Sequence, residues 1–248
     1  MSERYNFQNR AAQTGAQAGA MIDQGLRTYM LKVYNLMALG LVITGLASFT
    51  TWQLAVEGGQ LTAFGTALYA SPLRWVVMLA PLGLVFFLSF RINKMSVAAA
   101  QTTFWIYAAL MGLSLSSIFL VFTGQSIVQT FFVTAASFGA LSLYGYTTKR
   151  DMTAMGSFLI MGLFGLIIAS VVNIFLASSA MAFAISVIGV LIFAGLTAYD
   201  TQKIKEMYYD GDDTAVMGHK AIMGALTLYL DFINLFMFML QFLGNRNN

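Results

Sequence analysis

The sequence contains no cysteine, one histidine and few charged residues. Without cysteine, disulfide bonds, thiol catalysis and cysteine-ligated metal sites are excluded. The single histidine, His219, excludes a metal site built from several histidine ligands. Only 9% of the 248 residues are charged and 58% are hydrophobic, whereas about 25% of the residues in soluble domains are charged. This composition predicts an integral membrane protein.

The apolar stretches are continuous, without the alternation of apolar and polar residues that is typical of membrane β-barrels. They therefore predict an all-α protein. Residues 1–25 are rich in Gln, Ala and Gly, and they lack the apolar core and cleavage site of a signal peptide. We expect a flexible cytoplasmic N-terminal tail at 1–25 and a transmembrane domain at 26–248.

Windows of about 20 apolar residues, the length that crosses ~30 Å of hydrocarbon, recur along the transmembrane domain. They predict seven transmembrane helices near 31–54, 73–92, 98–122, 126–146, 155–177, 180–202 and 220–243. If the N-terminus is cytoplasmic, all of the 13 Lys and Arg residues except Arg74 and Arg246 lie on the cytoplasmic side. We therefore expect an external C-terminus, with a six-helix arrangement as the alternative.

Two acidic residues lie inside the predicted helices: Asp200 in "AGLTAYDTQKIK" and Asp231 in "LTLYLDFINLF". A charged residue near the bilayer centre costs about 2.5–3.5 kcal/mol on insertion scales. Asp200 is near a helix end, and Lys203 follows at i+3, so a peripheral ion pair explains it equally well.

Asp231 lies near the middle of the seventh predicted helix, on one stripe with Thr227 and Asn234. This stripe should face the interior of the bundle. The alternative is a protonated Asp231 that donates a hydrogen bond to a backbone carbonyl.

Consecutive helices tend to pack as antiparallel neighbours, so the sixth and seventh can bring Asp200 and Asp231 together. Two adjacent carboxylates do not both ionise cheaply and would share a proton. The protonated pair would clamp the helices together. The ionised pair would repel and offer oxygen ligands to a cation such as Ca²⁺. The two aspartates thus predict a pH switch.

These aspartate motifs, together with "GLSLSSIF" and "RTYMLKVYNLMALGLVITGL", resemble the bacterial branch of the Bax inhibitor-1 family. The resemblance covers about residues 23–243. It implies a seven-helix bundle in the bacterial inner membrane, with the last helix central and wrapped by the other six. It also implies a non-enzymatic, pH-sensitive calcium leak in which Asp200 and Asp231 form the sensor.

The family also has an arginine on its second helix that latches to the sixth-helix aspartate. Arg91, in "LSFRINKMS", is the best match to that arginine, and an ordinary positive-inside anchor is its alternative role. No resident cofactor is implied, only transient binding of Ca²⁺ by Asp200 and Asp231. Thr227 and Asn234 are candidate secondary ligands along the ion path.

Two other functions compete with the leak. Some bacterial relatives are regarded as regulators of a membrane-anchored quality-control protease, a role that the tail at 1–25 would suit. Intramembrane aspartyl proteases also carry two aspartates on their sixth and seventh helices, the first preceded by Tyr, as Tyr199 precedes Asp200. Their second aspartate lies in a Gly-x-Gly-Asp context that Asp231 lacks, which disfavours proteolysis. The expected partners are the lipid bilayer, calcium ions and a membrane protease, with no nucleic acid.

Overall fold

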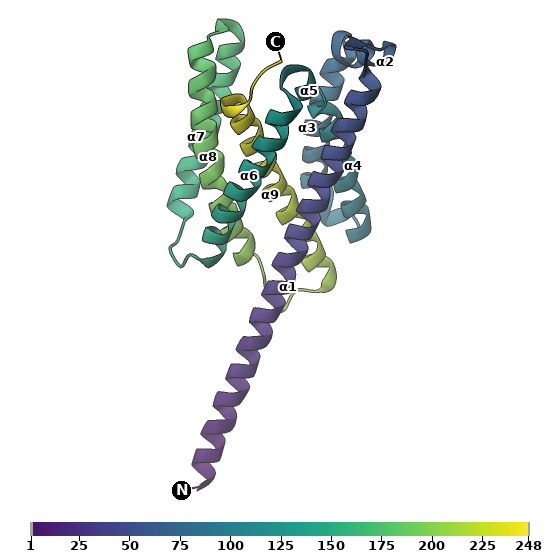
Figure 1. Ribbon diagram of the computed structural model, residues 1–248. Coiled ribbons are helices and arrows are strands. Elements are labelled where there is room, and N and C mark those ends of the chain that lie inside the picture. The colour runs from purple at the N-terminus through teal and green to yellow at the C-terminus, as the bar shows by residue number, and fades with distance from the viewer. Residues whose placement is uncertain (1, 248) are drawn as a thin grey trace.

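The computed structural model describes the backbone of residues 2–247 and the side chains of residues 23–247 (Figure 1). Within that part of the chain, seven helical segments are long and apolar enough to cross a membrane. They are Asp23–Ala55, Leu73–Lys94, Val97–Val121, Gly124–Thr147, Thr153–Leu176, Ser179–Glu206 and Thr214–Leu243. The two chain ends lie at opposite ends of the bundle (Figure 1). The prediction of seven helices rather than six is confirmed, while the cytoplasmic location of the N-terminus stays a prediction.

The membrane segments are built from eight α-helices, with one 3₁₀-helix at the end of the second segment (Figure 1). These are α1 (Ser2–Ala55), α3 (Leu73–Arg91), α4 (Val97–Leu115), α5 (Ile118–Val121), α6 (Gly124–Thr147), α7 (Thr153–Leu176), α8 (Ser179–Glu206) and α9 (Thr214–Leu243). The single-turn helix α5 extends α4, and the 3₁₀-helix η2 (Ile92–Lys94) extends α3. A hairpin of β1 (Val56–Glu57) and β2 (Gln60–Leu61), helix α2 (Ala63–Gly65) and the π-helix η1 (Thr66–Ala70) connect α1 to α3.

Helix α1 begins at Ser2, so residues 2–25 continue the first membrane helix in one line and project beyond the bundle (Figure 1). The transmembrane segment itself begins at Asp23. The flexibility expected for residues 1–25 stays a prediction.

Polar residues with extended backbone mark the start of several helices. Ser96, Thr123, Ser178 and Asp213 each precede a helix, and each side chain accepts a hydrogen bond from a backbone N–H in the first turn. Such caps satisfy donors that have no partner inside the helix. They explain why α4, α6, α8 and α9 begin where they do.

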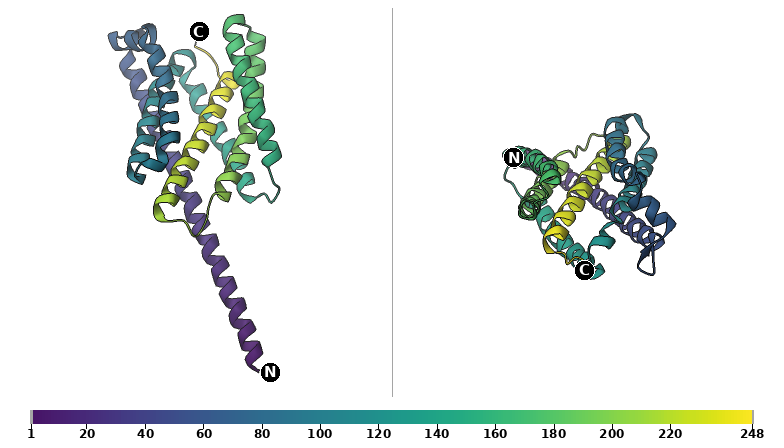
Figure 2. Two further views of the ribbon diagram at one scale, coloured as in Figure 1. Left: turned by 180° about the vertical axis from the view of Figure 1, so that it is seen from behind. Right: turned by 90° about the horizontal axis from the view of Figure 1, so that it is seen from above.

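Helix α9 is the axis of the bundle, as the family resemblance implies. In its most apolar window 67% of the residues are buried, compared with at most 39% in the other membrane segments. Helices α8, α1, α6 and α4 pack directly on it, while α3 packs mainly on α4 and α7 mainly on α8. The helices therefore form an inner layer around α9 with α3 and α7 outside it (Figures 1 and 2).

Tyr229 joins α9 to α1 and α4. Its hydroxyl is 2.6 Å from Thr44 Oγ1, and Thr44 also donates to the carbonyl of Ala108 at 2.9 Å. The rings of Phe104 and Tyr107 meet the Tyr229 ring edge to face. A buried tyrosine needs both apolar contacts and a partner for its hydroxyl, and this cluster provides both near the middle of α9.

The contact between α6 and α8 predicts a clear difference between two glycines on the same helix. A Cβ atom at Gly145 would lie 2.1 Å from the carbonyl oxygen of Ala198, whereas a Cβ at Gly139 would meet nothing within 4 Å. Gly145→Ala should separate the two backbones and cost about 1–3 kcal/mol. Thermal unfolding in detergent should show a lower Tm for Gly145→Ala and an unchanged Tm for the control Gly139→Ala. Equal Tm values for the two variants would contradict this close packing.

Candidate functional site

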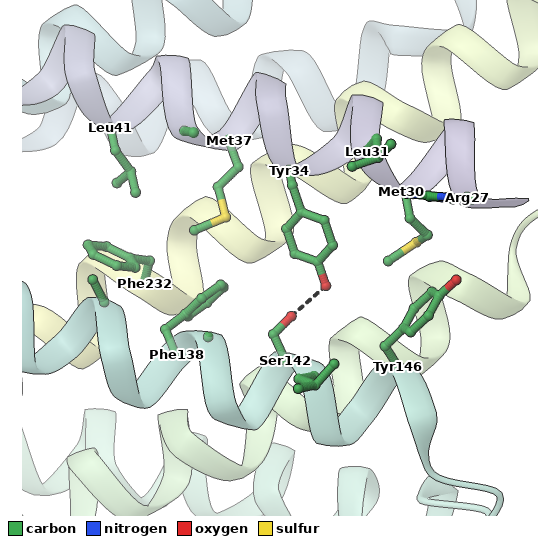
Figure 3. A pocket seen from close by; sticks show the side chains of 14 residues that line it. Arg27, Met30, Leu31, Tyr34, Met37, Leu41, Phe138, Ser142, Tyr146 and Phe232 are labelled. Carbon is green, nitrogen blue, oxygen red and sulfur yellow. Dashed lines mark hydrogen bonds between the residues drawn. The ribbon is translucent and has the colours of Figure 1, made fainter.

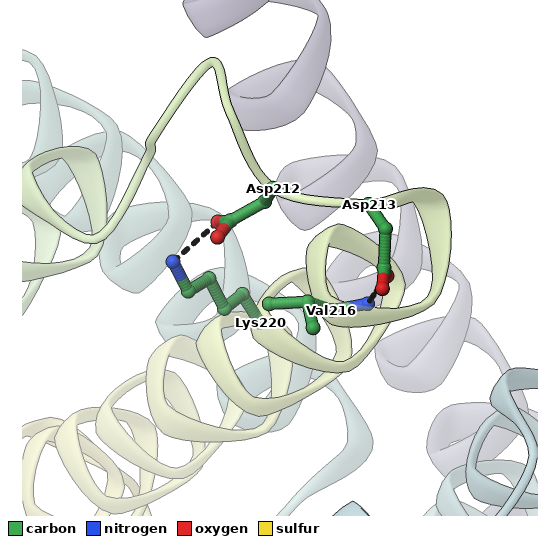
Figure 4. Close-up of polar contacts among 4 residues, drawn as sticks. All are labelled: Asp212, Asp213, Val216 and Lys220. Carbon is green, nitrogen blue, oxygen red and sulfur yellow. Dashed lines mark hydrogen bonds and ion pairs between the residues drawn. The ribbon is translucent and has the colours of Figure 1, made fainter.

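Acidic residues in the turn between α8 and α9 stabilise the start of α9 (Figure 4). Asp213 accepts a hydrogen bond from the Val216 amide at 2.8 Å, and Asp212 forms an ion pair with Lys220. Among the residues described, no group of three or more His, Cys, Asp or Glu side chains is placed to hold a metal ion. Asp213 therefore caps the start of α9, and Asp212 fixes the turn to α9 through Lys220.

Helix α9 crosses the bundle obliquely from this turn (Figure 2). Near its start, His219 Nε2 is 2.9 Å from the carbonyl of Met95, in the turn before α4. Near its end, Gln241 Oε1 accepts a hydrogen bond from Ser186, in the first turns of α8, at 3.3 Å. Helices α8 and α9 run antiparallel in this register, with Gly189 beside Phe238 and Gly224 beside Ile204, so a residue past the middle of α9 can meet a residue in the last two turns of α8.

Asp200 and Asp231 meet in this way. Both line a cavity of about 560 Å³ between α7, α8 and α9. Their side chains are close enough for a hydrogen bond when one carboxyl group carries a proton. The structure thus brings together the two acids that the sequence singles out.

Asp231 is the more deeply buried of the two, with 4% of its surface exposed, and Asp200 is half-buried. Asp231 Oδ2 is buried without a hydrogen-bond partner among the residues described. A buried polar atom with no partner carries a large desolvation cost. Proton sharing with Asp200, water or a cation would each reduce that cost.

Helix α7 adds the Ser170 hydroxyl to the cavity, and the other polar groups come from α8 and α9. Thr227 Oγ1 donates to the carbonyl of Met223 at 3.0 Å, and Asn234 Nδ2 donates to the carbonyl of Leu230 at 2.8 Å. Each side chain keeps an oxygen that can accept a hydrogen bond or ligate a cation. The cavity therefore has oxygen-bearing side chains at three successive levels of α9, at Thr227, Asp231 and Asn234.

Comparison with known proteins identifies the group to which this bundle belongs. The family model described as "Inhibitor of apoptosis-promoting Bax1" matches residues 26–248. The chain belongs to the Bax inhibitor-1 family. The match omits only residues 23–25 of the seven membrane segments.

Bacterial relatives are similar over nearly their whole length. An uncharacterized protein of Rickettsia prowazekii is 52% identical over 228 residues, 91% of this chain and 93% of the relative. An uncharacterized protein of Caulobacter vibrioides is 48% identical, over 93% of each chain. The inner membrane protein YbhL of Escherichia coli is 48% identical over 90% of this chain and 93% of its own. None of these names gives an enzymatic activity, and the absence of one here stays a prediction.

The family resemblance implied a latch between Arg91 and Asp200, and the structure does not form it. Arg91 is exposed at the end of α3, which packs on α4, on the other side of α9 from α7 and α8 (Figure 1). Arg91 does not line the aspartate cavity. The basic residue that lines the cavity with Asp200 is Lys203, one helical turn further along α8, whose Nζ lies 5.9 Å from the centre of the Tyr199 ring. In this arrangement Arg91 is a basic residue at the bundle surface.

Sequence analysis missed the residues that hold the end of α8 in place. Gln202 Oε1 accepts from the Met152 amide at 3.0 Å, and its Nε2 donates to the Arg150 carbonyl at 2.8 Å. Lys205 Nζ donates to the carbonyl of Tyr146 at 2.9 Å. These three bonds tie α8 to the last turn of α6 and to the turn between α6 and α7. The only signal in the sequence was the amide side chain of Gln202, at the end of an apolar predicted helix and two residues after Asp200.

Removal of the Gln202 amide should loosen this turn. Gln202→Ala leaves the Met152 N–H without its acceptor, and an unsatisfied buried donor costs about 1–3 kcal/mol. Hydrogen exchange at the Met152 amide should accelerate by at least about tenfold in Gln202→Ala. The exposed residue Lys149 lies in the same turn, and Lys149→Ala should leave the exchange rate unchanged. Unaltered protection of Met152 in Gln202→Ala would mean that this clamp does not hold the turn.

Proposed function

We propose that this protein is a pH-sensitive calcium leak of the bacterial inner membrane, gated by Asp200 and Asp231. The observation that carries the proposal is the meeting of these carboxyl groups in a cavity between α7, α8 and α9. The name of the E. coli relative, an inner membrane protein, supports the same location for this chain.

The gate depends on electrostatics between two carboxyl groups. When they share a proton, a hydrogen bond between Asp200 and Asp231 holds α8 against α9. When the proton leaves, two adjacent negative charges repel each other. The helices then separate at this level, and the carboxylate oxygens become available to a hard divalent cation.

The composition of the cavity suits brief occupancy by Ca²⁺. The titratable side chains that line it are Tyr199, Asp200, Lys203 and Asp231. The residues of α7 that line the cavity are not titratable. Thr227 and Asn234 add neutral oxygen atoms. An ion held by so few ligands can leave again, as conduction requires. The ammonium group of Lys203 limits residence further by repelling a divalent cation.

Calcium flux into liposomes tests this gate. Wild-type protein should conduct more Ca²⁺ as the pH rises, because the shared proton is lost. Asp231→Asn and Asp200→Asn remove the ionisable pair and should reduce both the flux and its pH dependence. A loss of about tenfold corresponds to about 1.4 kcal/mol of interaction with the ion. Equal flux and an unchanged pH profile in Asp231→Asn would exclude the aspartate gate.

Asp151 provides a matched control for this experiment. It is exposed in the turn between α6 and α7, where Oδ1 accepts a hydrogen bond from the Thr153 amide at 2.8 Å. Hydrogen bonds from the Thr153 hydroxyl and amide hold the pKa of the Asp151 carboxyl below its usual range. Asp151 therefore stays ionised around neutral pH. Asp151→Asn removes one charge outside the cavity and should leave the pH profile of the flux intact.

The second candidate function, modulation of a membrane-anchored quality-control protease, is supported by the N-terminal extension of α1 beyond the membrane segment (Figure 1). Deletion of residues 2–22 separates the two functions. If the protein is a leak, the truncated protein should conduct Ca²⁺ like the wild type, because the aspartate cavity is intact. Lost binding to a membrane protease together with intact flux would assign the tail a separate role. Lost flux would show that the cavity alone does not make the leak.

A further inference from the structure

A second cavity lies on another side of α9 and contains none of the residues of the aspartate cavity. It has a volume of about 710 Å³ and lies between α1 and α6, with Phe232 of α9 at its floor (Figure 3). We call it the α1–α6 groove. Two of its lining residues, Leu31 and Leu143, are 50% and 63% exposed on the outer surface of the bundle. The groove is therefore open to the hydrocarbon of the surrounding bilayer.

The groove changes from basic to polar to apolar along its length (Figure 3). Arg27 and Tyr146 lie at one end of it. In the middle, the Tyr34 hydroxyl is 2.5 Å from Ser142 Oγ. Beyond this pair, the lining is apolar and ends at Leu41 and the rings of Phe138 and Phe232. This order matches the order of phosphate, ester and acyl chain in a phospholipid.

Two cations lie at the basic end of the groove. Arg27 lines the groove directly, and Lys205 Nζ lies 5.4 Å from the centre of the Tyr146 ring, another lining side chain. Among residues 23–247, neither cation forms an ion pair with a carboxylate. Arg27 is therefore available to an anion in the groove, and Lys205, which also donates to the Tyr146 carbonyl, adds positive charge beside it. A further cavity of about 610 Å³ continues the groove past Leu41 and has no charged residue in its lining.

The length of the groove fits one leaflet. At a rise of about 1.5 Å per residue, the stretch of α1 from Arg27 to Leu41 spans roughly 21 Å. Half of a bilayer, headgroups included, is about 20–22 Å thick. A phosphate group at Arg27 therefore places the end of the acyl chain near Leu41, close to the bilayer midplane.

We propose that the α1–α6 groove binds one anionic phospholipid, with its phosphate against Arg27 and Lys205 and one acyl chain along Phe138 and Phe232. The Tyr34 and Ser142 hydroxyls lie at the level of the ester carbonyls, which are hydrogen-bond acceptors. A helix from a second copy of the chain would not need the cations, and a free phosphate would not need the apolar end. The amphipathic order of the groove favours the lipid over both. This site is independent of the calcium leak.

Native mass spectrometry of the full-length protein in detergent tests the proposal. Titration with phosphatidylglycerol or phosphatidylcholine of identical acyl chains should show one retained phosphatidylglycerol, bound about tenfold more tightly, which corresponds to about 1.4 kcal/mol of attraction between the anionic headgroup and the basic end of the groove. Arg27→Gln should remove most of this preference for the anionic headgroup, and Arg27 is exposed, so the variant should fold. Equal retention of both lipids by wild-type protein would overturn the site.

Gly139 allows the groove itself to be blocked. It lines the groove, and a Cβ atom there would meet nothing within 4 Å, so Gly139→Phe fills the space where the acyl chain lies. Gly165 of α7 is equally unobstructed and lines a different cavity, which makes Gly165→Phe the matched control. Gly139→Phe should lose the retained lipid and Gly165→Phe should keep it. Undiminished retention by Gly139→Phe would place the lipid elsewhere.

A soluble competitor distinguishes a lipid from a free anion. Glycerol 3-phosphate carries the phosphate but no acyl chain, and it should fail to displace phosphatidylglycerol at millimolar concentration. If it displaces the lipid completely, the site recognises a phosphate anion alone and the proposal is wrong.

Discussion

A carboxyl group inside a membrane bundle must pair with another group, bind a proton or contact water. The position of Asp231 imposes this requirement on α9. The surrounding helices bury Asp231 almost completely. The antiparallel register of α8 and α9 brings this residue to Asp200, near the end of α8. The ends of α9 contact different parts of the bundle, the turn before α4 through His219 and the first turns of α8 through Gln241. The packing that buries α9 therefore also places the two acids next to each other.

The end of α8 carries three different contacts on three of its faces. Asp200 and Lys203 face the aspartate cavity, while Gln202 holds the turn between α6 and α7 and Lys205 holds the last turn of α6. Thr201 faces α6, where its hydroxyl is 2.9 Å from Ser142 Oγ. A short stretch of helix therefore joins the proposed gate, a surface turn and the α1–α6 groove.

Much of this fold follows from local sequence properties. The seven spans are predictable because each apolar window is long enough to cross the hydrocarbon. The ends of the helices were less well predicted: α8 continues past 202 to Glu206, and α9 begins before 220, at Thr214. Polar turns lengthen both helices, and Asp213 caps the second outside the apolar window. Hydropathy does not register such turns.

The aspartate pair was predictable because an acid within an apolar helix is costly wherever its partner lies. The sequence did not predict where Arg91 lies relative to Asp200, or where Tyr34 lies relative to Ser142. Those relations depend on the order in which the helices surround α9, and no local pattern encodes that order. The family resemblance supplied the central helix correctly, but it also suggested a latch that this arrangement of α3 and α8 does not form.

The hydroxyl groups of Tyr34, Ser142 and Thr201 form a continuous chain from α1 through α6 to α8. Thr201 follows Asp200 directly, so the two side chains point to different sides of one rigid helical turn. Any rotation of α8 about its own axis that moves Asp200 away from Asp231 also turns Thr201 with respect to Ser142. One helical turn of α8 therefore carries the carboxyl pair on one side and the end of the hydroxyl chain on another.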